Sequence, residues 1–235
     1  FIKVTKNRQP FTEQDSIKKA TLVKKNSRAV DGIKSFKASD VALLKVAGSN
    51  YPTVKLGSIS SLTQGSNLMI IGFPGVAGSN GLVESKESKP TLTAGKGSAI
   101  KNSLGSTSKI IETDTTIGHG NSGGPAFETS GTVVGIATYT IDGSGKGNGT
   151  FNYIRDIKDL IDLASSAGVI PKAESATQKE WDKGIGLFYQ ARYSKAVKSF
   201  NLVKRLYPEH PKAQELIATA NERIRLGQDV KDFPY

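Results

Sequence analysis

GHGNSGGPAF, residues 118–127, is the stretch that decides how this chain folds, because it sets one serine among four glycines. Glycine adopts positive φ and lets the backbone approach another group closely. Two interpretations follow: a tight loop between strands, or a turn that exposes the hydroxyl of Ser122 as a nucleophile. A serine nucleophile needs a base to remove its proton and N–H donors to stabilise the developing oxyanion. Gly120 suits the second interpretation, because a side chain just before the serine crowds the oxyanion.

The composition of the chain limits its fold class and its partners. The 235 residues are 37% hydrophobic, which is enough for one large domain or two smaller ones. Cysteine is absent, so a disulfide framework and a cysteine-based zinc site are excluded. No apolar run approaches the roughly 18 residues of a membrane helix, so we expect no transmembrane span. The net charge of +11 is spread along the chain. It favours a solvated basic surface over attraction to an anionic cell wall, membrane or nucleic acid, and we expect no specific nucleic-acid binding.

Residues 1–155 show a β pattern, because short β-branched or apolar runs alternate with clusters of Gly, Ser, Asn and Pro. The runs are FIKV (1–4), ATLVKK (20–25), VALLKV (41–46), LMIIGF (68–73), SKIIET (108–113) and TVVGIATYT (132–140). Two glycine-rich stretches, AGKGSAI (94–100) and GSGKGNGT (143–150), lack the spacing of a phosphate-binding loop, and we interpret both as plain loops. The pattern predicts a mainly β sandwich or barrel.

The pattern becomes helical after residue 155. DIKDLIDLASSAG (156–168) places its apolar residues on one helix face, and we interpret residues 169–177 as a linker. Residues 178–235 predict two amphipathic helices and a third from about residue 212 to 226, with the proline-containing YPEHP (207–211) before the third. We therefore expect a small all-α domain after the β domain.

GNSGGP (120–125) resembles the nucleophile motif of the chymotrypsin-fold serine peptidases, and its surroundings are most similar to the bacterial trypsin-like, HtrA/DegP-type branch. Similar segments follow the family's order over nearly all of residues 1–165: SDVALLKV (39–46), GSNLMIIGFPG (65–75), TLTAGKGSAI (91–100), IIETDTTIGHGNSGGPAFETSGTVVGIATY (110–139) and NYIRDIKDLIDL (152–163). Five segments in order are far more specific than six residues. The resemblance implies a chymotrypsin-like double β-barrel over residues 1–168, with the first barrel incomplete at its N-terminal end.

The resemblance also implies a serine endopeptidase that acts on polypeptides and needs no cofactor or metal. Ser122 would be the nucleophile, and the N–H groups of Gly120 and Ser122 would form the oxyanion hole. Asp40 would be the acid that orients a histidine; the alternative is an ordinary residue ahead of a strand. Asn121 departs from the animal digestive enzymes, which have an acid there, so activation by a freed N-terminus is not expected.

The same resemblance places the substrate-binding residues on either side of Ser122. Thr116 falls at the base of the pocket, and His119 falls at its rim or in an exposed loop. The wall would comprise Ala137, Thr138 and Tyr139. No acid stands at the base, so we expect a small or medium neutral substrate side chain; glutamate is a weaker option, because Thr116 and His119 could bind a carboxylate.

The catalytic base is missing from the candidate residues. The chain has two histidines, His119 and His210. The resemblance places His119, three residues before Ser122, at the substrate pocket and therefore not between Ser122 and Asp40, and His210 lies in the helical part. In the family the histidine precedes a strand similar to FIKV, so we expect it upstream of Phe1 and expect this chain alone to be nearly inert. The alternative is a catalytically silent protease-fold protein that binds or scaffolds others.

Residues 179–212 resemble one tetratricopeptide repeat, with a bare helical hairpin as the alternative. The matching residues are Gly184, Leu187, Tyr193, Ala196, Phe200, Val203 and Pro208. One repeat buries little surface alone, so we expect residues 178–235 to bind a protein partner or to self-associate. The family resemblance further implies a secreted or cell-envelope location.

Overall fold

The computed structural model describes residues 2–3, 17–26, 41–73, 90–103, 107–142, 150–171 and 174–231, which form two compact units. The barrel unit comprises the described parts of Ala20–Val46 and Lys55–Pro171. The helical unit comprises those of Phe1–Lys19, Ala47–Val54 and Lys172–Tyr235. Within these ranges no helix is both long and apolar enough to cross a bilayer.

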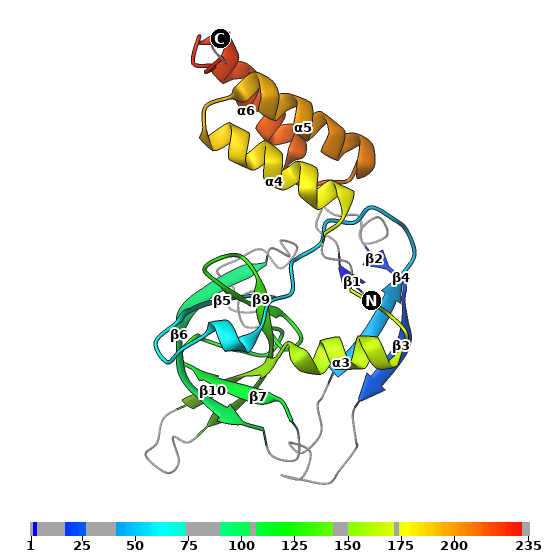
Figure 1. The fold of residues 1–235 in the computed structure, drawn as a ribbon, viewed down its shortest axis with the longest axis vertical. Helices are drawn as coiled ribbons and strands as arrows, with labels where there is room; N and C mark the ends of the chain where they lie inside the picture. Colours follow the sequence, from blue (N-terminus) through cyan, green and yellow to red (C-terminus); the bar gives the residue numbers. More distant parts are fainter. Residues whose placement is uncertain are drawn as a thin grey trace, which may run out of the picture. The chain divides into compact units, whose positions relative to one another are not determined.

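Six antiparallel strands of the barrel unit close into one barrel, in the order β10-β7-β6-β5-β8-β9 (Figure 1). The strands are β5 Asn67–Gly72, β6 Thr91–Asn102, β7 Lys109–Thr113, β8 Pro125–Glu128, β9 Val133–Asp142 and β10 Thr150–Asp156. The prediction of a mainly β chain with a barrel is confirmed. Because the barrel is closed, these strands leave no free sheet edge along their paired lengths.

Strand β6 shows that the interpretation of residues 94–100 as a loop was wrong. The two glycines in this stretch lie within the strand, and Gly95 serves a close approach instead of a turn. A Cβ built on Gly95 would lie 2.6 Å from Thr115 Oγ1 and would also meet the Asp114 carboxylate. The second glycine-rich stretch, 143–150, lies outside the described residues apart from Thr150, which begins β10.

Aliphatic side chains fill the barrel with the two-residue period of strands. On β5, Leu68 and Ile70 are buried between more exposed neighbours. They join a core cluster with Ile111, Val134 and Ile154, all of them fully buried. Burying each such side chain contributes about 1.5–3 kcal/mol. The core therefore holds β5 and β9, the strands that flank the GNSGGP stretch.

A second, two-stranded antiparallel sheet in the barrel unit pairs β3 (Ala20–Asn26) with β4 (Val41–Val46). A short 3-10 helix, η2 (Ile59–Ser61), follows before β5. Leu22 and Leu44 face each other across the two strands, and each remains about half exposed. Among the described residues only the β5–β10 barrel closes, so the first barrel of the expected double-barrel fold remains a prediction.

Helix α3 (Lys158–Ser166) follows β10 directly and runs beside β3 and β4 (Figure 1). Its Asp159 carboxylate accepts a hydrogen bond from Arg155 Nη1 at 3.0 Å, and both side chains are almost fully buried. The Ser108 hydroxyl donates to the other carboxylate oxygen at 2.5 Å. Lys24 Nζ on β3 donates to the Ser166 carbonyl at 2.8 Å. These contacts attach α3 both to the barrel and to the two-stranded sheet.

The helical unit contains α4 (Ala176–Tyr189), α5 (Tyr193–Leu206) and α6 (Ala213–Arg225), with a short pairing of β1 (Ile2–Lys3) and β2 (Ile17–Lys18). Helix α4 begins at an N-cap, Ser175, whose hydroxyl accepts from the Gln178 N–H. Gly184 lets α4 approach α5 closely, since a Cβ there would lie 2.6 Å from the Phe200 ring. This helical hairpin with a third helix fits both the repeat and the bare-hairpin interpretation, so the tetratricopeptide assignment remains a prediction.

The segment 47–54, between β4 and η2, lies with the helical unit, although it is far from α4 in sequence. The Thr177 hydroxyl donates to the Asn50 carbonyl at 2.6 Å, and the Ser175 N–H donates to Thr53 Oγ1 at 2.9 Å. The rings of Tyr51 and Tyr207 pack at 5.6 Å. No pattern in the sequence indicated these contacts. The expected division at residues 169–177 stays a prediction.

His210 predicts a pH dependence for the helical unit. Burial holds the pKa of His210 below its usual value of 6.5, and its ring packs 4.2 Å from the ring of Trp181. In the neutral form Nδ1 accepts a hydrogen bond from the Lys212 N–H at 3.3 Å. Because the pKa is lower in the folded state, the unfolded state binds more protons below about pH 6.5. Stability is therefore fully present above that pH and is lost as the pH falls.

The measurement is urea unfolding followed by the fluorescence of Trp181, the sole tryptophan of the chain. The urea concentration at the unfolding midpoint is expected to decrease when the pH is lowered from 7.5 to 5. His210→Gln is expected to remove the part of that decrease that is due to the histidine. An equal pH dependence of the wild type and the variant would contradict the prediction.

Candidate active site

The GNSGGP stretch forms a tight turn that leads into β8. The Asn121 N–H donates to the Gly118 carbonyl at 3.0 Å, and the Gly124 N–H donates to the Asn121 carbonyl at 2.8 Å. Gly120 and Gly123 have φ of +99° and +85°, a region that L side chains rarely adopt. The two glycines thus reverse the chain on either side of Ser122, whose side chain is exposed.

Strand β9 holds this turn from one side. The Gly123 N–H donates to the Ala137 carbonyl at 2.8 Å, and the Ala137 N–H donates to the Gly124 carbonyl at 2.9 Å. The Ser122 hydroxyl donates to the Thr138 carbonyl at 3.2 Å. The position of the hydroxyl is therefore set by β9, whose own place is fixed in the barrel core.

The backbone N–H groups around Ser122 differ in whether they donate a hydrogen bond. Those of Asn121 and Gly123 donate within the turn and to β9. Those of Gly120 and Ser122 have no hydrogen-bond acceptor in the part of the chain that the structure describes. Two available donors on either side of one residue are what an oxyanion hole requires. The assignment of Gly120 and Ser122 to that hole remains a prediction.

The end of β5 supports the turn from the other side. The Phe73 N–H donates to the Gly120 carbonyl at 3.3 Å. A Cβ on Gly72 would lie 2.9 Å from Asn121 Cα. The Asn121 side chain is 3% exposed, and its Oδ1 has no hydrogen-bond partner among the described residues. The turn is therefore packed directly against the end of β5, with no space for a Cβ at Gly72.

Gly124→Ala tests this packing. A Cβ at Gly124 would lie 2.8 Å from the Asn121 carbonyl oxygen and would also meet the Ile71 carbonyl oxygen. Backbone cannot move as a flexible side chain can, so we expect a loss of about 1–3 kcal/mol in the free energy of unfolding. Gly118→Ala is the matched control, because its Cβ meets nothing within 4 Å and its φ is not positive. Equal thermal midpoints for the two variants would contradict the prediction.

The structure brings the expected substrate-binding residues to two segments beside the turn. Thr116 and His119 are exposed and precede it, whereas Ala137, Thr138 and Tyr139 follow one another on β9. The Tyr139 ring stacks on that of Tyr153 at 4.9 Å, and burial raises the pKa of Tyr139 above its ordinary value. The assignment of these five residues to substrate binding remains a prediction.

Two threonines that the sequence analysis missed bind the same segment. The Thr93 hydroxyl on β6 donates to the Thr116 carbonyl at 3.0 Å. The Thr140 hydroxyl on β9 donates to the Ile117 carbonyl at 3.2 Å. Bonds of this kind join distant strands and leave no spacing pattern in the sequence.

A base for Ser122 is not found among the described contacts. Asp40 lies outside the described residues. His210 belongs to the helical unit. His119 makes no hydrogen bond to Ser122 in the described part of the chain, and the hydroxyl of Ser122 donates to a backbone carbonyl. In the described ranges no cluster of His, Asp and Glu could hold a metal ion.

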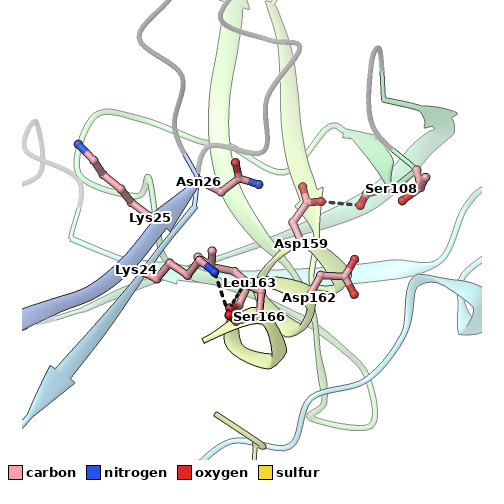
Figure 2. A pocket seen from close by; sticks show the side chains of 9 residues that line it. Lys24, Lys25, Asn26, Ser108, Asp159, Asp162, Leu163 and Ser166 are labelled. Atoms are coloured by element: carbon pink, nitrogen blue, oxygen red, sulfur yellow. Dashed lines mark hydrogen bonds between the residues drawn. The ribbon is translucent and has the colours of Figure 1, made fainter. Parts of the chain in front are cut away.

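A hollow of about 440 Å³ lies elsewhere in the barrel unit, between β3 and α3. Lys24, Lys25 and Asn26 border it from β3, and Asp159 and Asp162 border it from α3 (Figure 2). Asp159 is directed toward Ser108 and already accepts its hydrogen bond. None of the residues around Ser122 lines this hollow, so it is not part of the candidate active site.

Comparison with known proteins finds similar serine peptidases. A family model, the trypsin-like peptidase domain, matches residues 4–136. The probable periplasmic serine endoprotease DegP-like of Pseudomonas fulva (strain 12-X) is 35% identical over 168 residues, 71% of this chain and 31% of the relative. Its namesake from Ectopseudomonas mendocina (strain ymp) is 43% identical over 109 residues, 46% of this chain and 21% of the relative. The solved HtrA-type protease AlgW with decapeptide covers 68% of this chain and 52% of its own, with 25% identity and a TM-score of 0.45.

The chain thus spans about a third or less of the length of these two curated relatives. The match to the family model extends over more than half of the chain and includes β3 to β8 and the Ser122 turn. The chain therefore belongs to the trypsin-like peptidase domain family.

Proposed function

We propose that this protein is a serine endopeptidase of HtrA type that cleaves polypeptides through an acyl-enzyme on Ser122. One observation carries the proposal. The exposed Ser122 hydroxyl lies on a turn fixed by β9, and the N–H groups of Gly120 and Ser122 in that turn have no acceptor in the described ranges. A nucleophile beside unused donors can attack a carbonyl while the donors stabilise the resulting oxyanion.

The edge of β9 offers a place for the substrate backbone. Strand β8 pairs with β9 only as far as Ile136, whereas β10 pairs with it as far as Asp142. Residues 138–141 therefore have a strand on one side and, within the described chain, none on the other. An extended peptide can add to such an edge by main-chain hydrogen bonds. Its scissile carbonyl would then lie beside Ser122, and its neighbouring side chain beside Thr116 and His119.

The proposed mechanism needs a proton acceptor that these residues do not provide. We place this proton acceptor on a histidine outside the 235 residues, which Asp40 would orient. The histidine would replace the Thr138 carbonyl as the hydrogen-bond partner of the Ser122 hydroxyl. Attack on the substrate carbonyl then forms the Ser122 ester and transfers the serine proton, through the base, to the leaving amine. Water, deprotonated by the same base, hydrolyses the ester.

The helical unit and the relatives suggest the setting of this activity. Tyr189 at the end of α4 is 84% exposed, and Leu226 and Val230 near the C-terminal end are each about half exposed. Exposed apolar side chains on a small helical unit support binding of a protein partner or of a second copy. The matched relatives carry the name periplasmic, which supports a secreted or cell-envelope location.

A catalytically silent binding protein is the second candidate function. The observation that favours it is the hydrogen bond from Ser122 to the Thr138 carbonyl, because a hydroxyl that donates to a neutral carbonyl is not activated. The two candidates differ in one property, which is whether Ser122 reacts as a nucleophile.

The deciding experiment is intact mass spectrometry before and after a small fluorophosphonate. We expect a single adduct, mapped to Ser122, on the intact protein carrying its histidine, and no adduct on the 235-residue chain alone. Unfolded protein is the control for non-specific reaction. If an intact protein that contains the histidine forms no adduct with the probe, the result would support the catalytically silent binding protein and would contradict the peptidase proposal.

A further inference from the structure

The segment that leads into the Ser122 turn is held by side-chain hydrogen bonds from residue 114 to residue 117. We call residues 114–119 the approach segment. At its start the Asp114 carboxylate accepts from the Lys96 N–H at 2.5 Å, and the Asp114 N–H donates to the Lys96 carbonyl at 3.2 Å. The only carboxylate of the segment is thereby turned toward β6. The remainder of the segment, residues 115–119, carries no carboxylate of its own.

The last two restraints before the turn are the hydroxyls of Thr93 and Thr140. They donate to consecutive carbonyls, of Thr116 at 3.0 Å and of Ile117 at 3.2 Å. They come from β6 and β9, which are not neighbours in the barrel. Two hydroxyls from separate strands therefore restrain both the position and the rotation of the backbone at Thr116 and Ile117. A single hydrogen bond could not restrain both.

Thr140 also links the approach segment to the nucleophile. It lies two residues after Thr138, whose carbonyl accepts the hydrogen bond of Ser122. Two residues of a strand span about 6–7 Å. One rigid strand therefore sets the spacing between the Ser122 hydroxyl and the carbonyl of Ile117, three residues before Gly120.

Asn152 on β10 controls the direction in which the Thr140 hydroxyl points. It is opposite Thr140 across the ladder, and its side-chain oxygen lies 2.8 Å from Thr140 Oγ1. A hydroxyl has one hydrogen, so it can donate to Asn152 or to Ile117, but not to both at once. With its amide turned, Asn152 can donate to Thr140 and leave that hydrogen to the Ile117 carbonyl. Asn152 is 8% exposed, so its amide needs such an internal partner.

We propose that Thr93 and Thr140 are positioning residues for substrate selection, and that they hold the approach segment at the width that admits a small uncharged side chain. The inference rests on the proposed function, because it takes the approach segment as the part that meets the substrate side chain. With both carbonyls bound from outside and Asp114 turned toward β6, the segment itself presents no anionic group to a substrate side chain, which favours an uncharged one. Neither threonine touches the reacting atoms.

The test replaces each threonine by valine, which keeps the shape and removes the donor, in the intact protein. Two peptides differing only in valine or glycine on the acyl side of the scissile bond report selection. We expect Thr93→Val and Thr140→Val each to lower the valine-to-glycine ratio of kcat/KM about 10-fold, mainly through KM. Labelling by a small fluorophosphonate, which has no such side chain, should change less than about 3-fold. Thr140→Ser should restore the ratio.

Thr219→Val is the matched control, because Thr219 makes the same hydroxyl-to-carbonyl bond at 3.0 Å within α6. Asn152→Asp should lower the ratio as Thr140→Val does, since a carboxylate only accepts and takes the Thr140 hydrogen from Ile117. A ratio unchanged in Thr93→Val and Thr140→Val would overturn the proposal. An equal loss in the cleavage of both peptides and in labelling by the probe would also overturn the proposal, because it would indicate a merely structural role.

Hydrogen exchange of residues 114–120 separates this inference from the proposed function. If the wild type neither reacts with the probe nor cleaves peptides, the peptidase proposal fails by itself. The positioning role then depends on whether Thr93→Val and Thr140→Val speed exchange in this segment relative to Thr219→Val, with Thr140→Ser restoring it. Exchange at the wild-type rate in both valine variants would overturn the positioning role as well.

Discussion

Alanine in place of Ser122 is expected to leave the intact protein without measurable peptidase activity. Under the proposed function Ser122 and its base act as one unit, so loss of the hydroxyl should lower kcat by about 10⁶-fold, with only a residue of the catalysis retained by the oxyanion donors. The fold should not suffer, since Ser122 is exposed and its hydroxyl makes one described hydrogen bond. We expect a change of no more than about 1 kcal/mol in the free energy of unfolding.

The measurement combines peptide hydrolysis, fluorophosphonate labelling and the thermal midpoint. Ser130→Ala is the matched control, because Ser130 is an exposed serine of the same barrel whose hydroxyl donates to Glu128 Oε1 at 2.9 Å. It should keep both activity and labelling. Ser122→Ala protein that still hydrolyses peptides at the rate of Ser130→Ala would show that the nucleophile lies elsewhere.

The sequence predicted those parts of the fold that depend on local patterns. The run VALLKV gives β4 at the predicted residues 41–46, because β-branched and apolar residues suit a strand. The GNSGGP turn could be foreseen because glycine readily adopts the positive φ of Gly120 and Gly123, which other residues rarely do. Glycine also caused the error at β6, where Gly95 serves close packing against Thr115 instead of a turn.

Contacts between distant segments could not be predicted from one sequence. The hydroxyls of Thr93 and Thr140 reach the approach segment only because barrel closure brings β6 and β9 to it. The attachment of residues 47–54 to the helical unit depends likewise on single hydrogen bonds, such as that from Thr177 to Asn50. Threonines are common in strands, so neither contact has a distinguishing signature. The sequence therefore indicated the glycine turn that carries Ser122, but not the side chains that position that turn.

Asp159→Ala is expected to cause the largest loss of stability in the barrel unit. Asp159 and Arg155 form a buried ion pair at 3.0 Å, with side chains 4% and 3% exposed, and Arg155 Nε has no partner in the described part of the chain. Removing the carboxylate leaves a guanidinium charge buried without compensation and leaves Ser108 without its acceptor. Breaking such a pair costs about 3–5 kcal/mol. That loss is comparable to a large share of the stability of a typical domain.

Chemical denaturation of three variants separates this effect from the loss of a surface charge. Asp162→Ala removes the neighbouring carboxylate of α3, which pairs with Lys158 in an exposed (i, i+4) arrangement, and should change the free energy of unfolding very little. The double variant Arg155→Met/Asp159→Leu replaces the pair by apolar groups and should recover most of the stability, because no buried charge remains unpaired. If Asp159→Ala were no less stable than Asp162→Ala, the pair would not hold α3 to the barrel. If the double variant were as unstable as Asp159→Ala, shape and not charge would explain the loss.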